Sequence, residues 1–204
     1  MYRNEGGVST DYSKVETYDG NAPIHTLTIA DDGIEAGIIY KLRVLAVNIF
    51  GASDLSDEVN AGVSSFPAKP DSVTKNELES TQTAITLEWQ VSDDTELAVI
   101  GYVLKINDGT SEDYTTVYYG LYFPNVRKFL VSGLETGNIY SFTVQALNFN
   151  GPSEPSDAAS FIICQSPSQF GAPTMADVTR TSMTITWLAP VIDGGCPIYT
   201  YSLY

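Results

Sequence analysis

The sequence GNIYSFTVQALNFNGPSEPSDA, residues 137–158, is the second copy of a pattern that first occurs as GIIYKLRVLAVNIFGASDLSDE at residues 37–58. Because a repeat is a property of the whole fold, we establish it before assigning any secondary structure. Identical residues coincide without a gap at an offset of 100 residues by subtraction, among them Tyr40 and Tyr140, Val44 and Val144, Ala46 and Ala146, Asn48 and Asn148, Gly51 and Gly151, and Ser56 and Ser156.

A second pair of similar sequences lies elsewhere in the period, TAITLEWQVSDDTELAVIGYVLKI and TSMTITWLAPVIDGGCPIYTYSLY. Trp89 of the first corresponds to Trp187 of the second at an offset of 98 residues. Tyr102 corresponds to Tyr201 at an offset of 99 residues. The chain is therefore about two periods long.

Within each period the pattern is that of short strands. TAITLEWQV alternates apolar and polar residues and places Ile85, Leu87 and Trp89 on one face, which is typical of a half-buried strand. YSFTVQAL alternates too, and Leu147 alone breaks the pattern. Similar runs, GYVLKIN, TTVYYG, KFLVSGL and ASFIIC, are separated by Gly, Asn, Asp and Pro turns, and no window indicates an amphipathic helix. About seven short strands per ~100 residues predict an all-β chain of immunoglobulin-like β-sandwiches.

At these residues the chain resembles a tandem of fibronectin type III domains. The complete copy contains the leading PAKPDSV, the tryptophan of the second strand at Trp89, the tyrosine of the third strand at Tyr102, the corner LETGNIY and the run FTVQALNFNGPSEPS. The chain departs from the family at the residue before the corner glycine, where a proline is usual: it is Thr136 in the complete copy and Ala36 in the N-terminal one. The resemblance implies tandem β-sandwiches, one complete and two partial.

The repeat divides the chain into three parts. We expect residues 1–65 to be the C-terminal strands of one fibronectin type III domain, residues 66–165 a complete domain, and residues 166–204 the first three strands of a further one. Joined end to start, the tail and head read TYSLYRNEGGV, a third strand that runs into its turn. The favoured explanation is a window on a longer array. The alternative is that the tail of one chain completes the head of the next, giving head-to-tail filaments.

The resemblance also implies a set of structural core residues. The two tryptophans are expected between the sheets, and the corner tyrosines are expected to bury their rings while each hydroxyl bonds to nearby backbone. The predicted core residues are Trp89, Trp187, Tyr40, Tyr140, Tyr102 and Tyr201.

Aromatic residues gather after the third predicted strand, in YTTVYYGLYFP. Alternation along a strand can bury only about half of such a set, so some of the rings should be exposed and could anchor a protein partner. The candidates are Tyr118, Tyr119, Tyr122 and Phe123. In the alternative interpretation, these rings belong to an irregular strand and loop that cover the edge of the core of their own domain.

The sequence does not favour catalysis. His25 is the one histidine, and without a neighbouring cysteine or acidic residue it is expected to be a half-exposed strand residue. We find no Gly-x-Ser-x-Gly elbow, phosphate-binding glycine loop or Cys/His metal spacing, and we expect no cofactor and no metal. The acidic groups at residues 31–32, 93–94 and 54–58 could offer oxygens to calcium, but their spacing matches no ligand loop, so solvated turn charges are favoured.

The two cysteines, Cys164 and Cys196, fall in different repeats, and we expect them to remain unpaired. Cys196 follows the turn IDGG, where an inert exposed thiol is favoured over a reactive one, since no cationic neighbour lowers its pKa.

Charge excludes several classes of partner. The chain carries 25 acidic and 10 basic residues, a formal net charge of -15. Binding to nucleic acid or to anionic membrane surfaces needs clustered basic residues that are absent here. No stretch approaches the ~20 apolar residues of a membrane span, so direct membrane insertion of this segment is not expected. The sequence contains no Arg-Gly-Asp tripeptide and no Asn-x-Ser/Thr glycosylation site.

We therefore predict a non-catalytic module array, a spacer, adhesion or scaffold segment of a larger protein. Its partners are expected to be other proteins, including neighbouring repeats of the same or another chain. One alternative is a set of accessory modules of an extracellular enzyme, and another is an intracellular cytoskeletal or ciliary scaffold. An extracellular or cell-surface location is favoured over the intracellular one.

Overall fold

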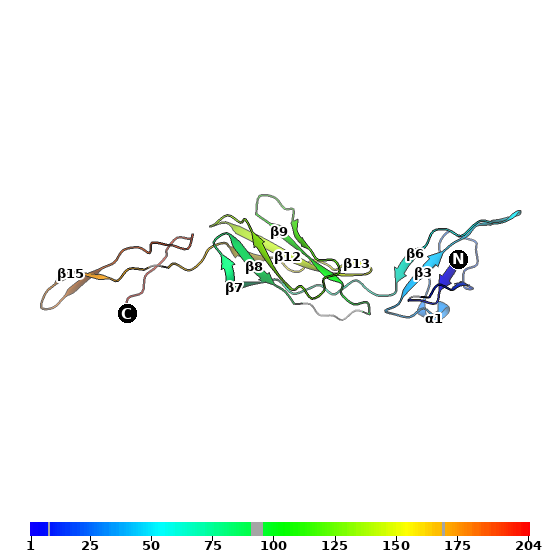
Figure 1. Cartoon of the computed structure of the whole chain (residues 1–204), viewed down its shortest axis with the longest axis horizontal. Coiled ribbons are helices and arrows are strands. Elements are labelled where there is room, and N and C mark those ends of the chain that lie inside the picture. Colours follow the sequence, from blue (N-terminus) through cyan, green and yellow to red (C-terminus); the bar gives the residue numbers. More distant parts are fainter. Residues whose placement is uncertain (8, 91–95, 169) are drawn as a thin grey trace.

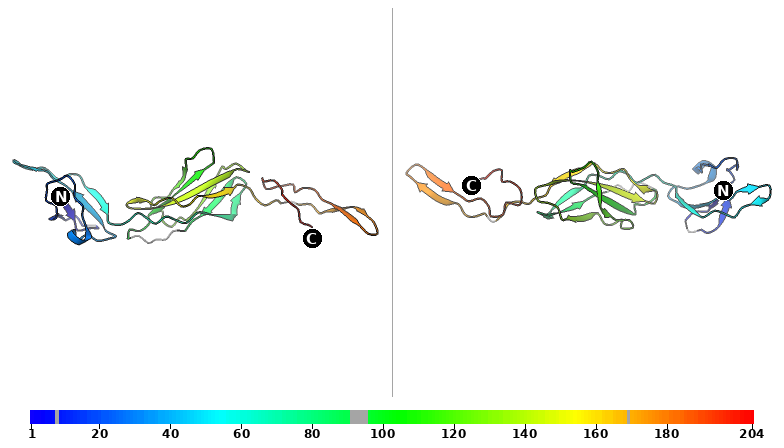
Figure 2. Two further views of the ribbon diagram at one scale, coloured as in Figure 1. Left: turned by 180° about the vertical axis from the view of Figure 1, so that it is seen from behind. Right: turned by 90° about the horizontal axis from the view of Figure 1, so that it is seen from above.

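The computed structural model describes residues 1–7, 9–90, 96–168 and 170–204. The chain forms an extended row of three parts (Figure 1). The N-terminal part and the C-terminal part lie at opposite ends of a central β-domain, and views from behind and from above show the same order (Figure 2).

The middle domain, between residues 67 and 163, consists of two antiparallel sheets. The strands of the larger sheet are β10 (Thr115–Tyr119), β9 (Gly101–Asn107), β12 (Ile139–Asn148), β13 (Gly151–Pro152) and β14 (Ala159–Ile162), where β13 and β14 both pair with β12. The strands of the smaller sheet are, in order, β11 (Lys128–Ser132), β8 (Ala84–Glu88) and β7 (Thr74–Thr81).

The core of this domain lies between the two sheets. From the smaller sheet Ile85 and Leu87 are fully buried, as the alternation in TAITLEWQV predicts. From the larger sheet Leu104, Phe142 and Val144 are fully buried against them. The prediction of an all-β chain of tandem β-sandwiches is confirmed.

Strand β12 is the centre of the larger sheet. It pairs with β9 from Ser141 opposite Asn107 to Leu147 opposite Gly101, and β14 pairs with its other edge. Leu147, which breaks the alternation, is nevertheless buried. A strand that is covered on both faces does not need strict alternation.

The N-terminal part contains one four-stranded antiparallel sheet and a short hairpin. The sheet has the order β2 (Tyr12–Lys14), β1 (Tyr2–Asn4), β3 (Ile39–Arg43) and β6 (Val59–Gly62), and the hairpin joins β4 (Val47–Asn48) to β5 (Gly51–Ala52). A single helical turn, α1 (Ile29–Asp32), begins after Thr28, whose hydroxyl accepts a hydrogen bond from the Asp31 N–H.

The C-terminal part contains a two-stranded ribbon of β15 (Thr174–Val178) and β16 (Met183–Thr186). Residues 197–204, where the sequence predicts a third strand, do not form one. In the middle domain the corresponding strand β9 pairs with β12 and β10, and the C-terminal part contains no equivalent of either strand among its described residues.

The corner tyrosines occupy the same position in the two copies of the repeat. The hydroxyl of Tyr140 accepts a hydrogen bond from the Glu135 N–H at 3.1 Å. The hydroxyl of Tyr40 accepts one from the Glu35 N–H at 2.9 Å. Both rings are buried, so each phenol satisfies a backbone donor while its ring contributes to the core.

We predict that Tyr140→Phe lowers the free energy of unfolding by about 1 to 2 kcal/mol, because the Glu135 N–H loses its acceptor. Tyr119→Phe, the same substitution at an exposed ring, should change it by less than ~0.5 kcal/mol. Urea unfolding followed by near-ultraviolet circular dichroism measures both. Equal effects of the two substitutions would show that the corner hydrogen bond is not stabilising.

Candidate functional site

Four of the six predicted core residues are buried. In the middle domain Trp89 and Tyr102 are each 1% exposed, and their rings meet edge to face with centroids 5.8 Å apart. Tyr140 is buried at the corner of the same domain, and Tyr40 is buried in the N-terminal part.

The other two, Trp187 and Tyr201, lie in the C-terminal part. Their centroids are also 5.8 Å apart, again edge to face. Trp187 is 38% exposed and Tyr201 is 43% exposed, because the only sheet among the described residues of this part is the ribbon of β15 and β16. Their placement between two sheets stays a prediction.

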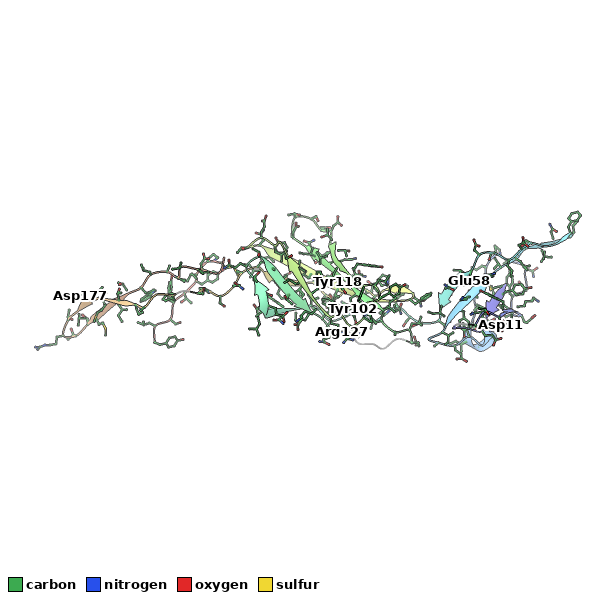
Figure 3. All side chains as sticks on the ribbon, viewed as in Figure 1. Asp11, Glu58, Tyr102, Tyr118, Arg127 and Asp177 are labelled. Atoms are coloured by element: carbon green, nitrogen blue, oxygen red, sulfur yellow. A yellow bond between two sulfur atoms is a disulfide. The ribbon has the colours of Figure 1, made fainter. Side chains whose placement is uncertain are left out.

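The aromatic cluster after β9 divides into an inner ring and three outer ones. Tyr118 lies near the end of β10 in the middle domain (Figure 3). The centroid of its ring is 4.7 Å from the ring centroid of Phe129 and 6.3 Å from that of Trp89. Burial raises the pKa of the Tyr118 hydroxyl above its ordinary value. This ring belongs to the edge of the core.

Tyr119, Tyr122 and Phe123 are 63%, 75% and 63% exposed. Tyr122 has a φ of 68° and is the one non-glycine residue with positive φ in the described part of the chain. A bulky residue in the left-handed region costs roughly 1 to 2 kcal/mol, and such strain is concentrated at functional sites.

The connection between the N-terminal part and the middle domain is held by asparagine side chains. The Nδ2 group of Asn150 donates hydrogen bonds to the carbonyl oxygens of Gly62 at 3.1 Å and of Ser64 at 2.8 Å. The Nδ2 group of Asn148 donates to the carbonyl of Ser65 at 2.9 Å. Three main-chain acceptors, at the end of β6 and in the connection that follows it, are therefore fixed to one end of β12 and the turn after it.

The same connection also contacts the middle domain through the Ser64 side chain. The Ser64 hydroxyl donates to Glu96 at 3.0 Å and accepts from the Leu97 N–H at 3.2 Å. Together with a backbone N–H of Glu96 itself, that hydroxyl holds the pKa of the Glu96 carboxyl below its ordinary value. A Cβ on Gly62 would lie 2.6 Å from the end of the Leu97 side chain and 2.8 Å from the Asn150 side-chain oxygen, so a larger residue at this position would require these side chains to shift.

The connection between the middle domain and the C-terminal part contains a disulfide between Cys164 and Cys196, with Cα atoms 5.8 Å apart. The prediction that the two cysteines remain unpaired, and that Cys196 is an inert exposed thiol, is therefore wrong. They are 32 residues apart in sequence and belong to different repeats, but the turn before Cys196 folds back against the connection. Two residues that belong to different repeats can therefore lie close together where the repeats meet.

Hydrogen bonds show how the turn reaches the connection. The Gln165 N–H donates to the Gly194 carbonyl at 2.9 Å, and the Ser168 N–H donates to the Ile192 carbonyl at 2.9 Å. The Gln165 side chain donates to the Ser80 carbonyl at the end of β7, at 2.8 Å. One glutamine thus ties the middle domain to the C-terminal part next to the disulfide.

His25 has an acidic neighbour that its sequence position did not indicate. Its Nε2 atom lies 4.0 Å from Asp32 and 3.0 Å from the Thr17 hydroxyl oxygen. The Thr17 hydroxyl donates its proton to Asp32, and this hydrogen bond is the main reason that the pKa of the Asp32 carboxyl is lowered. Since the hydroxyl proton points to the carboxylate and not to the imidazole, the arrangement is not that of a nucleophile activated by a base.

The acidic groups have identifiable roles where the structure describes them. Asp31 and Asp32 bond to Thr28 at the start of α1. Glu58 pairs with Lys41 at 3.2 Å and accepts a hydrogen bond from the Tyr12 hydroxyl. The pair at residues 93–94 lies outside the described residues. Within the described ranges no three His, Cys, Asp or Glu side chains form a metal-binding group, and no helix has both the length and the apolar character needed to cross a membrane.

Comparison with known protein families places the middle domain. The model of the family described as "Fibronectin type III domain" matches residues 69–162.

Similar curated proteins are much longer than this chain. Myomesin-2 of Homo sapiens is 29% identical over 180 residues, which are 83% of this chain and 12% of that protein. "M-protein, striated muscle" of Gallus gallus is 31% identical over 176 residues, 79% of this chain and 11% of that protein. "Receptor-type tyrosine-protein phosphatase eta" of Gallus gallus is 27% identical over 194 residues, 95% of this chain and 12% of that protein. The chain thus spans about an eighth of the length of each of these relatives.

We predict that the native, unreduced protein has no free thiol, and that its two cysteines become reactive only after reduction. A thiol-reactive dye in denaturant, with and without reductant, measures this, and a non-reducing peptide map should join the peptides of Cys164 and Cys196. Cys196→Ser, as the control, should leave one free thiol. Dye reaction with two thiols in the unreduced, denatured protein would contradict the disulfide.

Proposed function

Because the chain is a tandem fibronectin type III protein, we propose that it is a stiff, non-catalytic spacer and protein-interaction segment. We assign residues 1–65 to the C-terminal strands of one such domain, residues 66–165 to a complete domain, and residues 166–204 to the N-terminal strands of a third. The observation that carries the proposal is that specific contacts bind both connections to the middle domain.

A spacer holds its ends at a fixed distance only if its connections do not bend. A flexible polar connection lets neighbouring domains reorient, which is the ordinary case for domains in one chain. Here the first connection has acceptors bonded to Asn148 and Asn150, and the second has the Cys164–Cys196 disulfide and Gln165. These contacts support a single preferred orientation at each connection.

The function is proposed to be positional, without catalysis. Fibronectin type III domains are non-catalytic modules. The similarity to the receptor-type phosphatase involves 12% of that protein, and Myomesin-2 and the striated-muscle M-protein, at 29% and 31% identity, are more similar to this chain than the phosphatase is at 27%. In the cluster of Thr17, Asp32 and His25 the threonine hydroxyl donates to the carboxylate and not to the imidazole, which is not the arrangement of a nucleophile activated by a histidine base.

We place the protein outside the cell or on its surface. A disulfide persists in oxidising compartments and is rare in the reducing cytosol. The bond between Cys164 and Cys196 therefore favours an extracellular location over the cytoskeletal alternative, even though one of the relatives is a striated-muscle protein by name.

The surface proposed for a protein partner is formed by Tyr119, Tyr122 and Phe123. Exposed aromatic rings on a rigid scaffold supply large contact area, and tyrosine is enriched at binding hot spots. The strain at Tyr122 supports a role for this ring beyond covering the core edge.

The stiffness is tested by small-angle X-ray scattering of the chain at dilutions where it is monomeric. Asn150→Ala removes two hydrogen bonds at the first connection, and Cys196→Ser removes the covalent link at the second. We predict that each variant broadens the distribution of interatomic distances, because its connection bends. The double variant should show a broader distribution than either single variant, since the two connections lie at opposite ends of the middle domain and bend independently.

Asn138→Ala is the matched control, because the side chain of this asparagine donates to Glu135 of its own domain. It should leave the scattering unchanged. A native chain whose scattering requires a broad ensemble of bent shapes would refute the rigid spacer.

Tyr122→Gly separates binding from core packing. Glycine adopts a φ of 68° without strain, so we predict that the free energy of unfolding is unchanged or rises by up to about 1 kcal/mol. Tyr118→Ala, at the inner ring, should lower it by about 2 to 4 kcal/mol. Denaturant unfolding measures both. A loss above ~1 kcal/mol for Tyr122→Gly would show that this ring covers the core edge and is not held out for a partner.

A further inference from the structure

The described residues between Cys164 and Cys196 form one long hairpin (Figure 1). Its two arms run antiparallel from the cysteines through β15 and β16 to a turn at residues 179–182. The disulfide therefore joins the arms at the open end of this hairpin. From the open end to the turn, the residues that pair across the hairpin are Gln165 and Gly194, Ser168 and Ile192, Thr174 and Thr186, Met175 and Ile185, Asp177 and Thr184, and Val178 and Met183.

The middle domain begins with the corresponding hairpin. Its paired strands are β7 and β8, where Thr74 lies opposite Glu88, as Thr174 lies opposite Thr186 in the C-terminal part. In each copy the residue after the second strand of the pair is the tryptophan of the repeat. The two connections therefore lead into the same hairpin of two successive repeats.

The residues at the open end of the hairpin also correspond. Ser64 corresponds to Cys164 at an offset of 100 residues, and Leu97 corresponds to Cys196 at the offset of 99 residues that relates the two third-strand tyrosines. The Leu97 N–H donates a hydrogen bond to the Ser64 hydroxyl oxygen at 3.2 Å. The same pair of positions is therefore in contact at both connections, through a hydrogen bond at the first and a covalent bond at the second.

The corner glycine of the preceding unit approaches the same loop at each connection. A Cβ on Gly37 would lie 2.9 Å from the Glu96 carbonyl oxygen, and a Cβ on Gly137 would lie 3.7 Å from the Gly195 carbonyl oxygen. These two carbonyl groups belong to the residues directly before the contact pair. The approach of one repeat to the next is therefore similar at the two connections.

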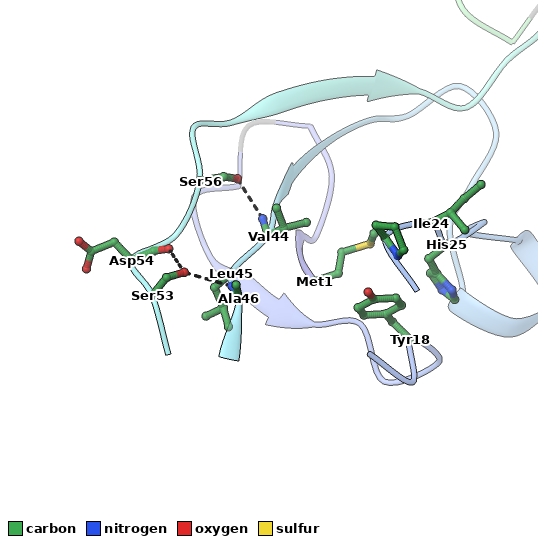
Figure 4. A pocket seen from close by; sticks show the side chains of 11 residues that line it. Met1, Tyr18, Ile24, His25, Val44, Leu45, Ala46, Ser53, Asp54 and Ser56 are labelled. Carbon is green, nitrogen blue, oxygen red and sulfur yellow. Dashed lines mark hydrogen bonds between the residues drawn. The ribbon is translucent and has the colours of Figure 1, made fainter. Parts of the chain in front are cut away.

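The last strand before each connection is held in the same way. The Gly37 N–H donates to the Val63 carbonyl at 2.8 Å, and the Gly137 N–H donates to the Ile163 carbonyl at 2.9 Å. Farther back, serine hydroxyls accept hydrogen bonds from the main chain of the neighbouring strand, as Figure 4 shows for the N-terminal part. The bonded pairs are Val44 with Ser56 and Ala46 with Ser53, and in the middle domain Val144 with Ser156 and Ala146 with Ser153.

Tension along the chain acts on the open end of such a hairpin. It pulls the two arms apart there, so the load falls on one pair of residues at a time and not on all pairs together. A hydrogen bond contributes only about 0.5 to 1.5 kcal/mol net, so the pairs give way in succession. A covalent bond across the open end keeps the load from reaching the first pair.

We propose that the pair of positions at the open end is the tension-bearing contact of each connection, and that the disulfide makes the second connection a clamp. The clamp passes tension from Cys164 directly to Cys196, so residues 165–195 carry none. At the first connection the Ser64 and Leu97 hydrogen bond has this place, so that connection yields at lower tension. The proposal rests on the spacer function proposed above.

The clamp is sensitive to reduction. A dithiol reductant supplies two electrons and two protons, the S–S bond breaks, two cysteine thiols form, and the reductant becomes a cyclic disulfide. The reduced connection then lengthens under tension, whereas the oxidised one does not.

Stretching single chains between handles at their two ends measures the clamp. The oxidised chain should release no length from residues 165–195. In Cys196→Ser the hairpin should open before the middle domain unfolds and add about 100 Å, because a separation of 32 residues, at ~3.3 to 3.6 Å each, replaces a Cα distance of 5.8 Å. Unfolding of the middle domain releases roughly 300 Å and is distinguishable from this step. Dithiothreitol, added while the middle domain is held folded under tension, should release the same ~100 Å in the native chain.

Thr186→Ala is the matched control. It removes the side-chain hydrogen bond to Thr174, at 3.0 Å, and leaves the disulfide in place. It should add no step to the oxidised chain, because the load does not reach the hairpin. A Cys196→Ser chain whose hairpin opens only with or after the middle domain would overturn the proposal, since noncovalent contacts would then bear the tension.

Moving the disulfide tests whether the two connections are equivalent. In a chain whose native cysteines are replaced by serine, Ser64→Cys with Leu97→Cys should form a disulfide on air oxidation, which a non-reducing peptide map identifies. The bonded oxygen and nitrogen lie within two bonds of their own Cα atoms, so these Cα atoms are about 6 Å apart and within disulfide range. Ser64→Cys with Leu78→Cys, whose side chain is 97% exposed on β7, should not form one. A 64/97 variant that folds, by near-ultraviolet circular dichroism, but stays reduced would refute the equivalence.

Failure of the clamp and failure of the rigid spacer are distinguishable. Scattering without load reports whether the connections bend, and stretching reports whether they lengthen. A chain that bends at rest, yet releases the ~100 Å step only when the disulfide is absent, would contradict the rigid spacer and support the clamp.

Discussion

The packing of Trp89 against Tyr102 and Val144 is the contact on which the rest of the structure depends. A fibronectin type III sandwich has one core, and here Trp89, which directly follows β8 of one sheet, packs in one cluster with Tyr102 of β9 and Val144 of β12 from the other. Each of the three is nearly inaccessible to solvent in the middle domain. Where residues from both sheets are present together, the sandwich is complete.

The same constraint explains why the N-terminal and C-terminal parts are less well packed. The N-terminal part supplies the equivalent of β12, and the C-terminal part supplies the equivalent of the tryptophan and the residues that correspond to the third strand, which form no strand there. Val44 and Trp187 are consequently exposed, although their counterparts Val144 and Trp89 are buried. The local structure of the repeat forms without the full core: Ser56 bonds to the Val44 N–H at 3.0 Å, as Ser156 bonds to Val144 at 3.0 Å.

The strands of the middle domain follow from the sequence because each depends on a pattern that is local along the chain. GYVLKIN coincides with β9, and alternation in TAITLEWQV correctly selects Ile85 and Leu87 as core residues. Alternation along β10 should also indicate which of the clustered aromatic rings points inward. A register shift in β10 between Thr116 and Tyr118 disturbs this alternation, so the sequence does not identify the inward ring. The disulfide could not be predicted, because its formation depends on how the turn before Cys196 lies against the connection after Ile163.

The connections differ from the domains in that their chemistry is not repeated. Asn150, which binds the first connection, corresponds to Phe50 in the other copy of the repeat, and Phe50 is 91% exposed. The Cys164–Cys196 bond also occurs once, since the chain has no other cysteine. A repeat fixes the fold of each domain, whereas the contacts that hold one domain against the next depend largely on residues that the repeat does not share, although Asn148, which corresponds to Asn48, also binds the first connection. The geometry of such an array can therefore change one connection at a time without altering any core.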